Sequence, residues 1–137
     1  MDFKDNSKEY KDLLNQAIRR GLRAIGMSAE TYAKENCPVD TGYARNSITH
    51  ALSGESAAVS SYEADRGKNG GPPKTGEYRG TTGKIEDSYV AIGSNVEYFP
   101  LIEEGAKGRA AHHTLRKAAT DHKDEYKQLL IDGLKNA

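Results

Sequence analysis

The triplet Asp40-Thr41-Gly42 is the stretch of this chain whose residue types most directly suggest chemistry. Aspartic proteases carry their catalytic carboxylate in such a triplet, and the retroviral type is a homodimer of chains of similar length. Two copies of Asp40 would have to share a proton across the dimer axis, because two adjacent carboxylates cannot both ionise. Ala91-Ile92-Gly93 weakly matches the second hydrophobic-glycine element of such an enzyme.

The surroundings of the triplet argue against proteolysis. In those proteases an apolar strand precedes the triplet and a small residue follows it, whereas here a helical pattern and Pro38 precede it and Tyr43 follows. A bare three-residue match is also a weak signal. The structural alternative is that the Asp40 side chain caps a turn, and that Gly42 relaxes the backbone where a helix gives way to a strand. We favour this alternative and keep a homodimeric aspartic protease as the second hypothesis.

Two glycines, Gly71 and Gly76, have the spacing of a phosphate-binding loop. That motif continues with a lysine for the phosphates and a serine or threonine for magnesium. Glu77 and Tyr78 stand at those positions here, and a carboxylate repels phosphate. No hydrophobic strand precedes the motif, so these residues predict a loop and not a nucleotide site.

The histidines and the cysteine do not form a ligand set in the sequence. His112 and His113 are adjacent, so their side chains would point about 100° apart on a helix, and His122 lies more than two turns further on. Neither a carboxylate nor a thiol stands at ligand spacing. Cys37 is the only cysteine, which excludes an internal disulfide and fits a reducing compartment. We therefore expect no metal, no cofactor and no catalytic residues.

The composition predicts a single domain, residues 1–137. The 20 basic and 20 acidic residues balance, so the whole protein attracts neither nucleic acid nor an anionic membrane. Arg19, Arg20 and Arg23 are best explained as one charged helix face. Hydrophobic residues make up only 36% and tryptophan is absent, which suggests that neighbouring chains contribute to burial. No apolar run reaches the ~18 residues of a membrane span, and the first residues do not resemble an export signal.

Hydrophobic periodicity predicts the elements that position these residues. Apolar residues recur every three or four positions, which predicts a long amphipathic helix from Ser7 to Glu35, ended by Pro38. Gly21 and Gly26 inside it indicate a bend or a close packing contact. Three segments have the alternation of strands, with a hairpin turn at 53–55 between the first two: residues 46–53, 56–63 and 85–93.

The remaining segments complete an α+β fold. Residues 64–84 contain six glycines and two prolines; so polar a loop cannot order itself, and we expect it to be mobile in the free subunit. Pro100 begins a short helix that Gly105 ends in a left-handed conformation, and a final helix is predicted from His112 to Leu134. The fold class is α+β: a long N-terminal helix, a small mainly antiparallel sheet with a long flexible loop, and a C-terminal helix packed on the sheet.

Three ordered blocks stand in the chain, within a resemblance that covers about residues 10 to 130: CPVDTGYARNSI (37–48), VAIGSNVEYFPLIEEGA (90–106) and AHHTLRKAATDHKDEY (111–126). Together they resemble the head–tail neck or tail-completion family of long-tailed, lambda-like bacteriophages and prophages, named for a gene-ten product. The chain departs from the family pattern at Phe99, where a small residue usually precedes Pro100. The matching positions are Pro38, Val39, Asp40, Thr41, Gly42, Arg45 and Ser47, then Gly93, Tyr98, Pro100, Glu103 or Glu104 and Gly105, then Leu115, Arg116 and Ala118.

The resemblance implies a structural virion protein and not an enzyme. It implies a ring-forming subunit at the neck that helps to join tail to capsid, made in the bacterial cytoplasm. Rings of about six copies would match the symmetry of the tail. The implied partners are further copies of the chain, the head–tail connector and the tail-tube or terminator proteins. DNA would pass through the ring lumen without specific binding.

Residues 65–84 are our candidate for the partner-binding loop. Their basic side chains outnumber Asp65 and Glu77, which suits an acidic partner face on which the loop becomes ordered. A passive surface insertion is the alternative, because loops tolerate insertions well. The basic residues of this hypothesis are Lys68, Lys74, Arg79 and Lys84.

Overall fold

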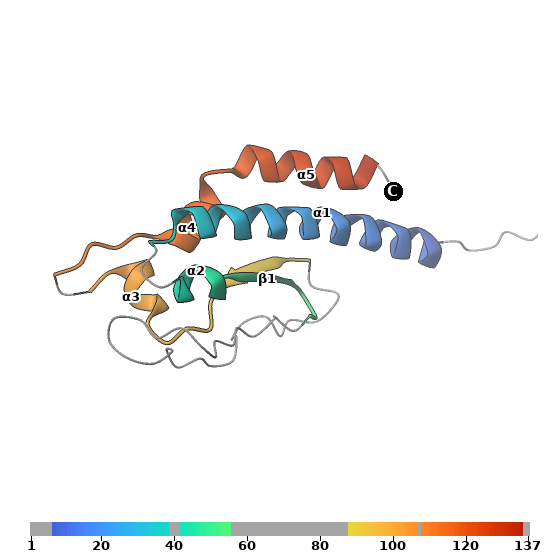
Figure 1. The fold of residues 1–137 in the computed structure, drawn as a ribbon. Helices are drawn as coiled ribbons and strands as arrows, with labels where there is room; N and C mark the ends of the chain where they lie inside the picture. The colour runs from blue at the N-terminus through green and yellow to red at the C-terminus, as the bar shows by residue number, and fades with distance from the viewer. Residues whose placement is uncertain (1–6, 39–41, 56–87, 107, 136–137) are drawn as a thin grey trace, which may run out of the picture.

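A single long helix, α1, forms the middle layer of the protein (Figure 1). The structure is a computed structural model and describes residues 7–38, 42–55, 88–106 and 108–135. Its elements are α1 (Ser7–Asn36), α2 (Tyr43–Ser47), β1 (Thr49–Leu52), β2 (Val90–Gly93), α3 (Phe99–Glu104), α4 (Thr114–Thr120) and α5 (Lys123–Lys135).

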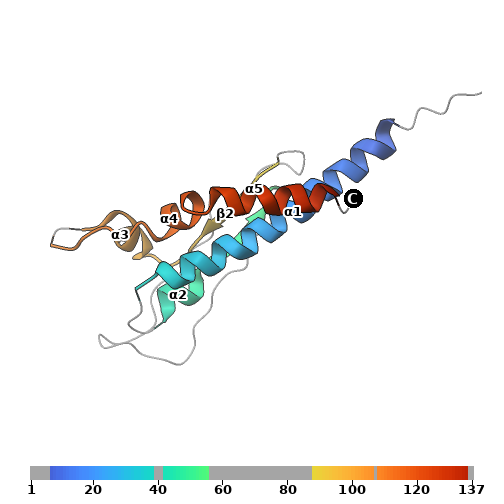
Figure 2. The same cartoon turned by 90° about the horizontal axis from the view of Figure 1, so that it is seen from above.

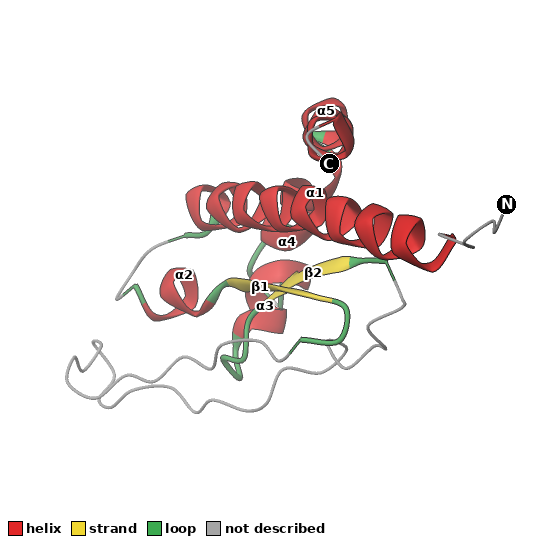
Figure 3. Cartoon of the chain, turned by 90° about the vertical axis from the view of Figure 1, so that its right-hand side faces the viewer, coloured by secondary structure: helices red, strands yellow, loops and turns green. Residues whose placement is uncertain are grey.

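The predicted α+β fold class is confirmed. Strands β1 and β2 pair antiparallel on one side of α1, and α5 lies on the opposite side (Figures 1 and 3). The short helices α2, α3 and α4 gather towards the C-terminal end of α1 (Figure 2). Of the predicted C-terminal helix, the α4 part reaches the core beside the sheet, whereas the α5 part packs on α1.

Two glycines let α1 approach its neighbours closely. A Cβ atom on Gly21 would lie 2.9 Å from Leu130 Cδ1 and 3.0 Å from Leu130 Cα in α5. On the opposite side, a Cβ atom on Gly26 would lie 2.7 Å from His50 Cδ2 and 2.8 Å from Val90 Cγ2 in the sheet. The predicted close packing at both glycines is therefore confirmed, and their lack of a side chain sets the spacing of all three layers.

The first predicted strand is shorter than expected. Asn46 and Ser47 belong to α2, and β1 begins at Thr49. The reason is local. Gly42 adopts a left-handed φ of 87°, and its carbonyl accepts a hydrogen bond of 2.9 Å from the Asn46 backbone N–H. This hydrogen bond starts a helical turn at the residues that were predicted to begin the strand. The predicted strand 56–63 and residues 64–84 lie outside the described residues, and β1 pairs with β2 in the part that is described.

The prediction of one continuous helix from His112 to Leu134 is wrong. The chain forms α4 and α5 and breaks at Asp121 and His122. Because α4 must reach the core while α5 follows the outer side of α1 (Figure 1), one straight helix cannot satisfy both contacts. The Tyr126 hydroxyl donates a hydrogen bond to the Ala118 carbonyl and so pairs a backbone acceptor close to the break.

Candidate functional site

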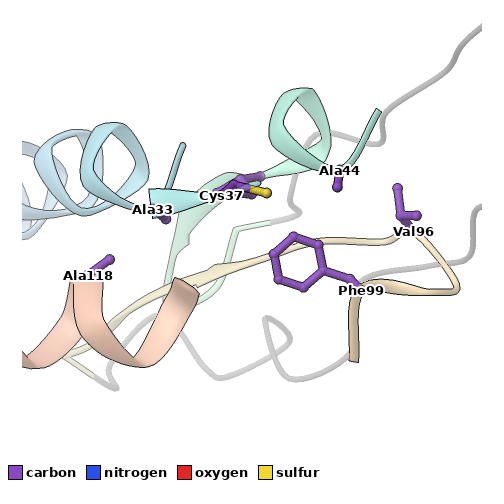
Figure 4. Packing of buried hydrophobic residues seen from close by; sticks show 7 residues of the cluster. Ala33, Cys37, Ala44, Val96, Phe99 and Ala118 are labelled. Atoms are coloured by element: carbon purple, nitrogen blue, oxygen red, sulfur yellow. The ribbon is translucent and has the colours of Figure 1, made fainter. Parts of the chain in front are cut away.

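The three sequence blocks converge on one cluster of buried residues at the C-terminal end of α1. Figure 4 shows the Phe99 ring pointing into this cluster, with Cys37 and Ala118 on neighbouring segments. The blocks thus share a structural role, since each contributes core residues. The buried members are Ala33, Cys37, Ala44, Ile48, Val96, Phe99 and Ala118, and partly buried Tyr32, Ile92, Tyr98, Ile102 and Leu115 pack against them.

The first block turns the chain from α1 towards the sheet. Pro38 is exposed after α1, Gly42 supplies the left-handed residue before α2, and Arg45 is exposed on α2. Asp40 and Thr41 lie outside the described residues. The triplet therefore follows α1 and Pro38, not an apolar strand, and its last residue leads into α2, which differs from the protease context described above.

A pair of serines ties the first block to the second. Ser47 is fully buried, and its hydroxyl oxygen lies 2.6 Å from the Ala44 carbonyl and also contacts the Ser94 hydroxyl. Ser94 in turn accepts a hydrogen bond of 3.2 Å from the Val96 backbone N–H. Ser47 was a predicted motif residue, whereas Ser94 was missed, because nothing in the linear sequence pairs two serines that lie 47 positions apart.

The second block forms the sheet end and α3. Gly93 closes β2 opposite Thr49, Tyr98 precedes α3, and Pro100 is the second helical residue. Gly105 has the expected positive φ of 82°, but its ψ of 173° is extended, which differs from the predicted left-handed helical conformation. A Cβ atom on Gly105 would lie 2.9 Å from the Ala111 backbone nitrogen, so the turn towards α4 requires glycine for space as well as for φ.

Glu103 connects the second block to the third. Its carboxylate accepts hydrogen bonds from the backbone N–H groups of Leu115 at 2.8 Å and Arg116 at 2.9 Å, which are otherwise unpaired donors in the first turn of α4. The neighbouring Glu104, the other acid that the family pattern allows at this position, makes an exposed ion pair of 3.2 Å with Arg116. Of the two acids, Glu103 is therefore the one that caps α4.

We expect Glu103→Ala to lower the free energy of unfolding by about 1–2 kcal/mol, because two helix N-terminal donors lose a charged acceptor. Glu104→Ala is the matched control, and removing its exposed ion pair should cost no more than ~0.5 kcal/mol. Urea unfolding followed by circular dichroism measures both values. Equal losses for the two variants would contradict the capping role of Glu103.

An aromatic cluster fixes the break between α4 and α5 against α1. The rings of Tyr32 and His122 stack with centroids 3.5 Å apart, and the Tyr32 hydroxyl donates a hydrogen bond to the Glu125 carboxylate. That hydrogen bond raises the pKa of Tyr32. Burial raises the pKa of Tyr126 to about 12. Both shifts favour the neutral phenol in the folded protein.

Stability should therefore fall at alkaline pH. The pKa of Tyr126 is near 10 in the unfolded chain and about 12 in the folded protein. Its contribution to the free energy of unfolding is therefore fully present below pH ~10 and is lost as the pH rises towards 12. This contribution is on the order of 2 kcal/mol. Urea unfolding between pH 9 and 12 should show a smaller alkaline loss for Tyr126→Phe than for the wild type. Identical losses would show that Tyr126 does not cause the dependence.

Two of the three arginines of α1, Arg19 and Arg23, are used within the fold. Arg19 donates a hydrogen bond of 3.0 Å to the Ser53 carbonyl, and both Arg19 and Arg23 form ion pairs with the Glu55 carboxylate. This contact joins α1 to the turn that follows β1. It supports the interpretation of these arginines as a structural helix face and gives no support to a DNA-binding surface.

Reactive or metal-binding groups do not gather in the described residues. The Cys37 thiol is buried beside the Pro38 carbonyl at 3.6 Å, and burial raises its pKa, which disfavours the reactive thiolate. In the described ranges no group of three or more His, Cys, Asp or Glu side chains could hold a metal ion. The helices in these ranges also include none with the length and apolar character needed to cross a membrane.

Residues 1–105, out of 137, match the model of one protein family, described as "Bacteriophage HK97-gp10, putative tail-component". The chain belongs to this family. No curated protein and no solved structure matches it. Membership in the HK97-gp10-like family confirms the resemblance drawn from the first two blocks and makes the protein a phage tail component.

The family match contains the first block and all but the last residue of the second, and it ends at Gly105, before the third block. In this HK97-gp10-like protein the third block is nevertheless part of the same structural unit, because Glu103 caps α4 and Ala118 is fully buried in the shared core. Neither the family nor the described geometry supports the aspartic-protease hypothesis for Asp40.

Proposed function

We propose that the protein is a ring-forming subunit at the junction of head and tail, where it helps to join the tail to the capsid. The observation that carries this proposal is the family match over residues 1–105. On this proposal residues 1–137 form one domain, about six copies close a ring, and assembly occurs in the bacterial cytoplasm before the subunit enters the virion. DNA passes through the ring without specific contacts.

The composition of the core supports an assembly role. Alanines supply about half of the buried apolar residues in the described part of the chain, and several large apolar side chains remain exposed instead. A subunit with so small a core gains stability when neighbouring copies cover its apolar surface. The buried cluster around Phe99 gives each subunit a fixed shape. The exposed faces of the helices are then available for contacts with neighbouring subunits.

A phage in which this gene is inactivated tests the proposal. We expect lysates to contain separate heads and tails in electron micrographs, and plasmid-encoded wild-type protein should restore joined virions. Purified subunit mixed with the cognate connector should give closed rings in electron micrographs, and mass photometry should give their copy number. Normal virions from the inactivated phage would refute a role in joining.

The loop hypothesis gives a separate prediction. Residues 65–84 lie outside the described residues, and their proposed role rests on the sequence alone: Lys68, Lys74, Arg79 and Lys84 would contact an acidic face of the connector or of the tail tube. Deleting residues 65–84 should leave the circular dichroism spectrum of a folded subunit and abolish head–tail joining. Unchanged phage titres would identify the loop as a passive insertion.

A further inference from the structure

Helix α5 lies on the side of α1 opposite to the sheet (Figures 1 and 3). Among the described elements α5 packs extensively on α1 alone, whereas α4 packs on both α1 and α3 and buries Ala118 completely in the core. The chain joins α4 to α5 through Asp121 and His122. Helix α5 is therefore attached to the body of the subunit by one short connection and by its contact with α1.

The backbone of this connection is compatible with a continuous helix. Neither Asp121 nor His122 is a proline or a glycine, and Asp121 has helical dihedral angles, with φ at −79° and ψ at −10°. His122 does not have a positive φ either. Tertiary contacts therefore maintain the break, and a change of backbone angles at these two residues would join α4 and α5 in one helix.

A continuous helix would pair backbone groups that have no helical partner at the break. The last backbone hydrogen bond of α4 is donated by Asp121 and the first of α5 by Tyr126. The N–H groups of residues 122–125 and the carbonyls of residues 118–121 therefore lack the partners that an unbroken helix gives them. In one helix these groups would bond to each other, and the Ala118 carbonyl would accept a backbone N–H in place of the Tyr126 hydroxyl.

The contact between α1 and α5 does not depend on the connection. A Cβ atom on Gly133 of α5 would lie 3.0 Å from the Gly21 Cα, which shows how closely the two backbones fit. The Tyr32 hydroxyl of α1 also donates a hydrogen bond to the Glu125 carboxylate of α5. These contacts would form identically if the two helices came from different chains, and for this reason the exchange of an identical element is a low-cost route to assembly.

We propose that α5 is exchanged between subunits on assembly: α4 and α5 straighten into one helix, and α5 packs on α1 of the next copy. A straight helix cannot keep α4 in the core and α5 on its own α1, so straightening also frees the surface of α1 that α5 covers. The partner is a second copy of this chain, and the fit is the one seen within the subunit. In the ring of the proposed function, on which this inference rests, each subunit would give one α5 and receive one.

Effective concentration decides which arrangement forms. In an isolated subunit the short connection holds α5 beside its own α1, and a free second copy cannot match that effective concentration. The exchange also gives up the stack of Tyr32 on His122, with centroids 3.5 Å apart, and the Tyr126 bond to Ala118. In a ring the neighbours are held together by other contacts, and the backbone hydrogen bonds of the continuous helix then favour the exchange.

Cross-linking between differently tagged chains tests the exchange. One chain carries Tyr32→Cys and the other Glu125→Cys, because these residues touch across α1 and α5, and the two are mixed with the cognate connector. We expect a short bis-maleimide to join the two tags in rings at least tenfold more than in the unassembled mixture, and wild type controls for the buried Cys37. Rings without these cross-links would overturn the exchange and leave the ring proposal standing, whereas cross-linked chains without rings would overturn only the ring.

Tying α5 to its own α1 supplies the second test. In a single chain that carries both Tyr32→Cys and Glu125→Cys, a thiol-cleavable linker attached to dilute monomers should lower the yield of rings at least tenfold. Dithiothreitol, which removes the linker, should restore the rings. Tied subunits that form rings as well as untied ones would refute the exchange.

Lys123→Pro tests the continuous helix itself. Proline suits the first residue of α5, but it lacks the N–H that residue 123 would donate to Ala119 in one helix. This substitution, made in both tagged chains, should leave the circular dichroism spectrum of the subunit unchanged and lower the cross-linking between tags at least tenfold. Lys123→Ala, which allows both arrangements, should keep the cross-links. Equal cross-linking in the two variants would contradict the straightened helix.

Discussion

Replacing Phe99 by alanine is expected to lower the free energy of unfolding by about 3–5 kcal/mol, the range for removing a buried aromatic ring. The ring is 3% exposed and is the largest side chain in a cluster whose other members include Ala33, Ala44 and Ala118. The alanine neighbours are too small to fill the cavity that the missing ring would leave. Guanidinium unfolding followed by circular dichroism measures it.

Leu101→Ala provides the matched control for this prediction. Leu101 lies on the same helix, α3, but is 52% exposed, so its truncation should cost less than ~1 kcal/mol. The pair also bears on the family pattern, in which a small residue usually precedes the proline. If Phe99→Ala were as stable as Leu101→Ala, the cluster would not depend on Phe99, and the departure from the family pattern would be neutral.

Features that depend on neighbouring residues could be predicted from the sequence. The span of α1 followed from its apolar periodicity and from Pro38, and the observed helix, Ser7–Asn36, ends one residue later than predicted. Gly21 and Gly26 were recognised because glycine inside a strong helix lowers helix propensity and therefore implies a packing reason. The family blocks were recognised for the same reason, since each is a continuous run of residues.

Features that depend on distant segments could not be predicted. The helix break at Asp121 and His122 contains no proline or glycine from which it could be predicted. It forms because α4 packs in the core whereas α5 packs on α1. The apolar periodicity of α1 also did not separate the exposed Tyr10 from the buried Ala17 and Leu22, because a sequence does not say how far a covering helix extends. The choice of Glu103 over Glu104 as the cap likewise depends on where α4 begins.

The closest approach of two helix backbones gives the second large prediction. Gly133→Leu places a side chain where a Cβ atom alone would lie 3.0 Å from the Cα and N atoms of Gly21, and backbone atoms cannot move aside as a side chain can. Helix α5 must then shift away from α1 and lose contacts of Leu130. We expect a net loss of about 3 kcal/mol in the free energy of unfolding, although leucine raises helix propensity by ~0.8 kcal/mol.

Lys127→Leu introduces the same side chain into the same helix at an exposed position and should change stability by no more than ~0.5 kcal/mol. The comparison separates crowding from the effect of an added leucine side chain, and the propensity gain of ~0.8 kcal/mol applies to Gly133→Leu alone, because lysine and leucine have similar helix propensities. A Gly133→Leu protein as stable as the wild type would mean that α5 does not lie against Gly21, and the layer order of α5, α1 and sheet would have to be revised.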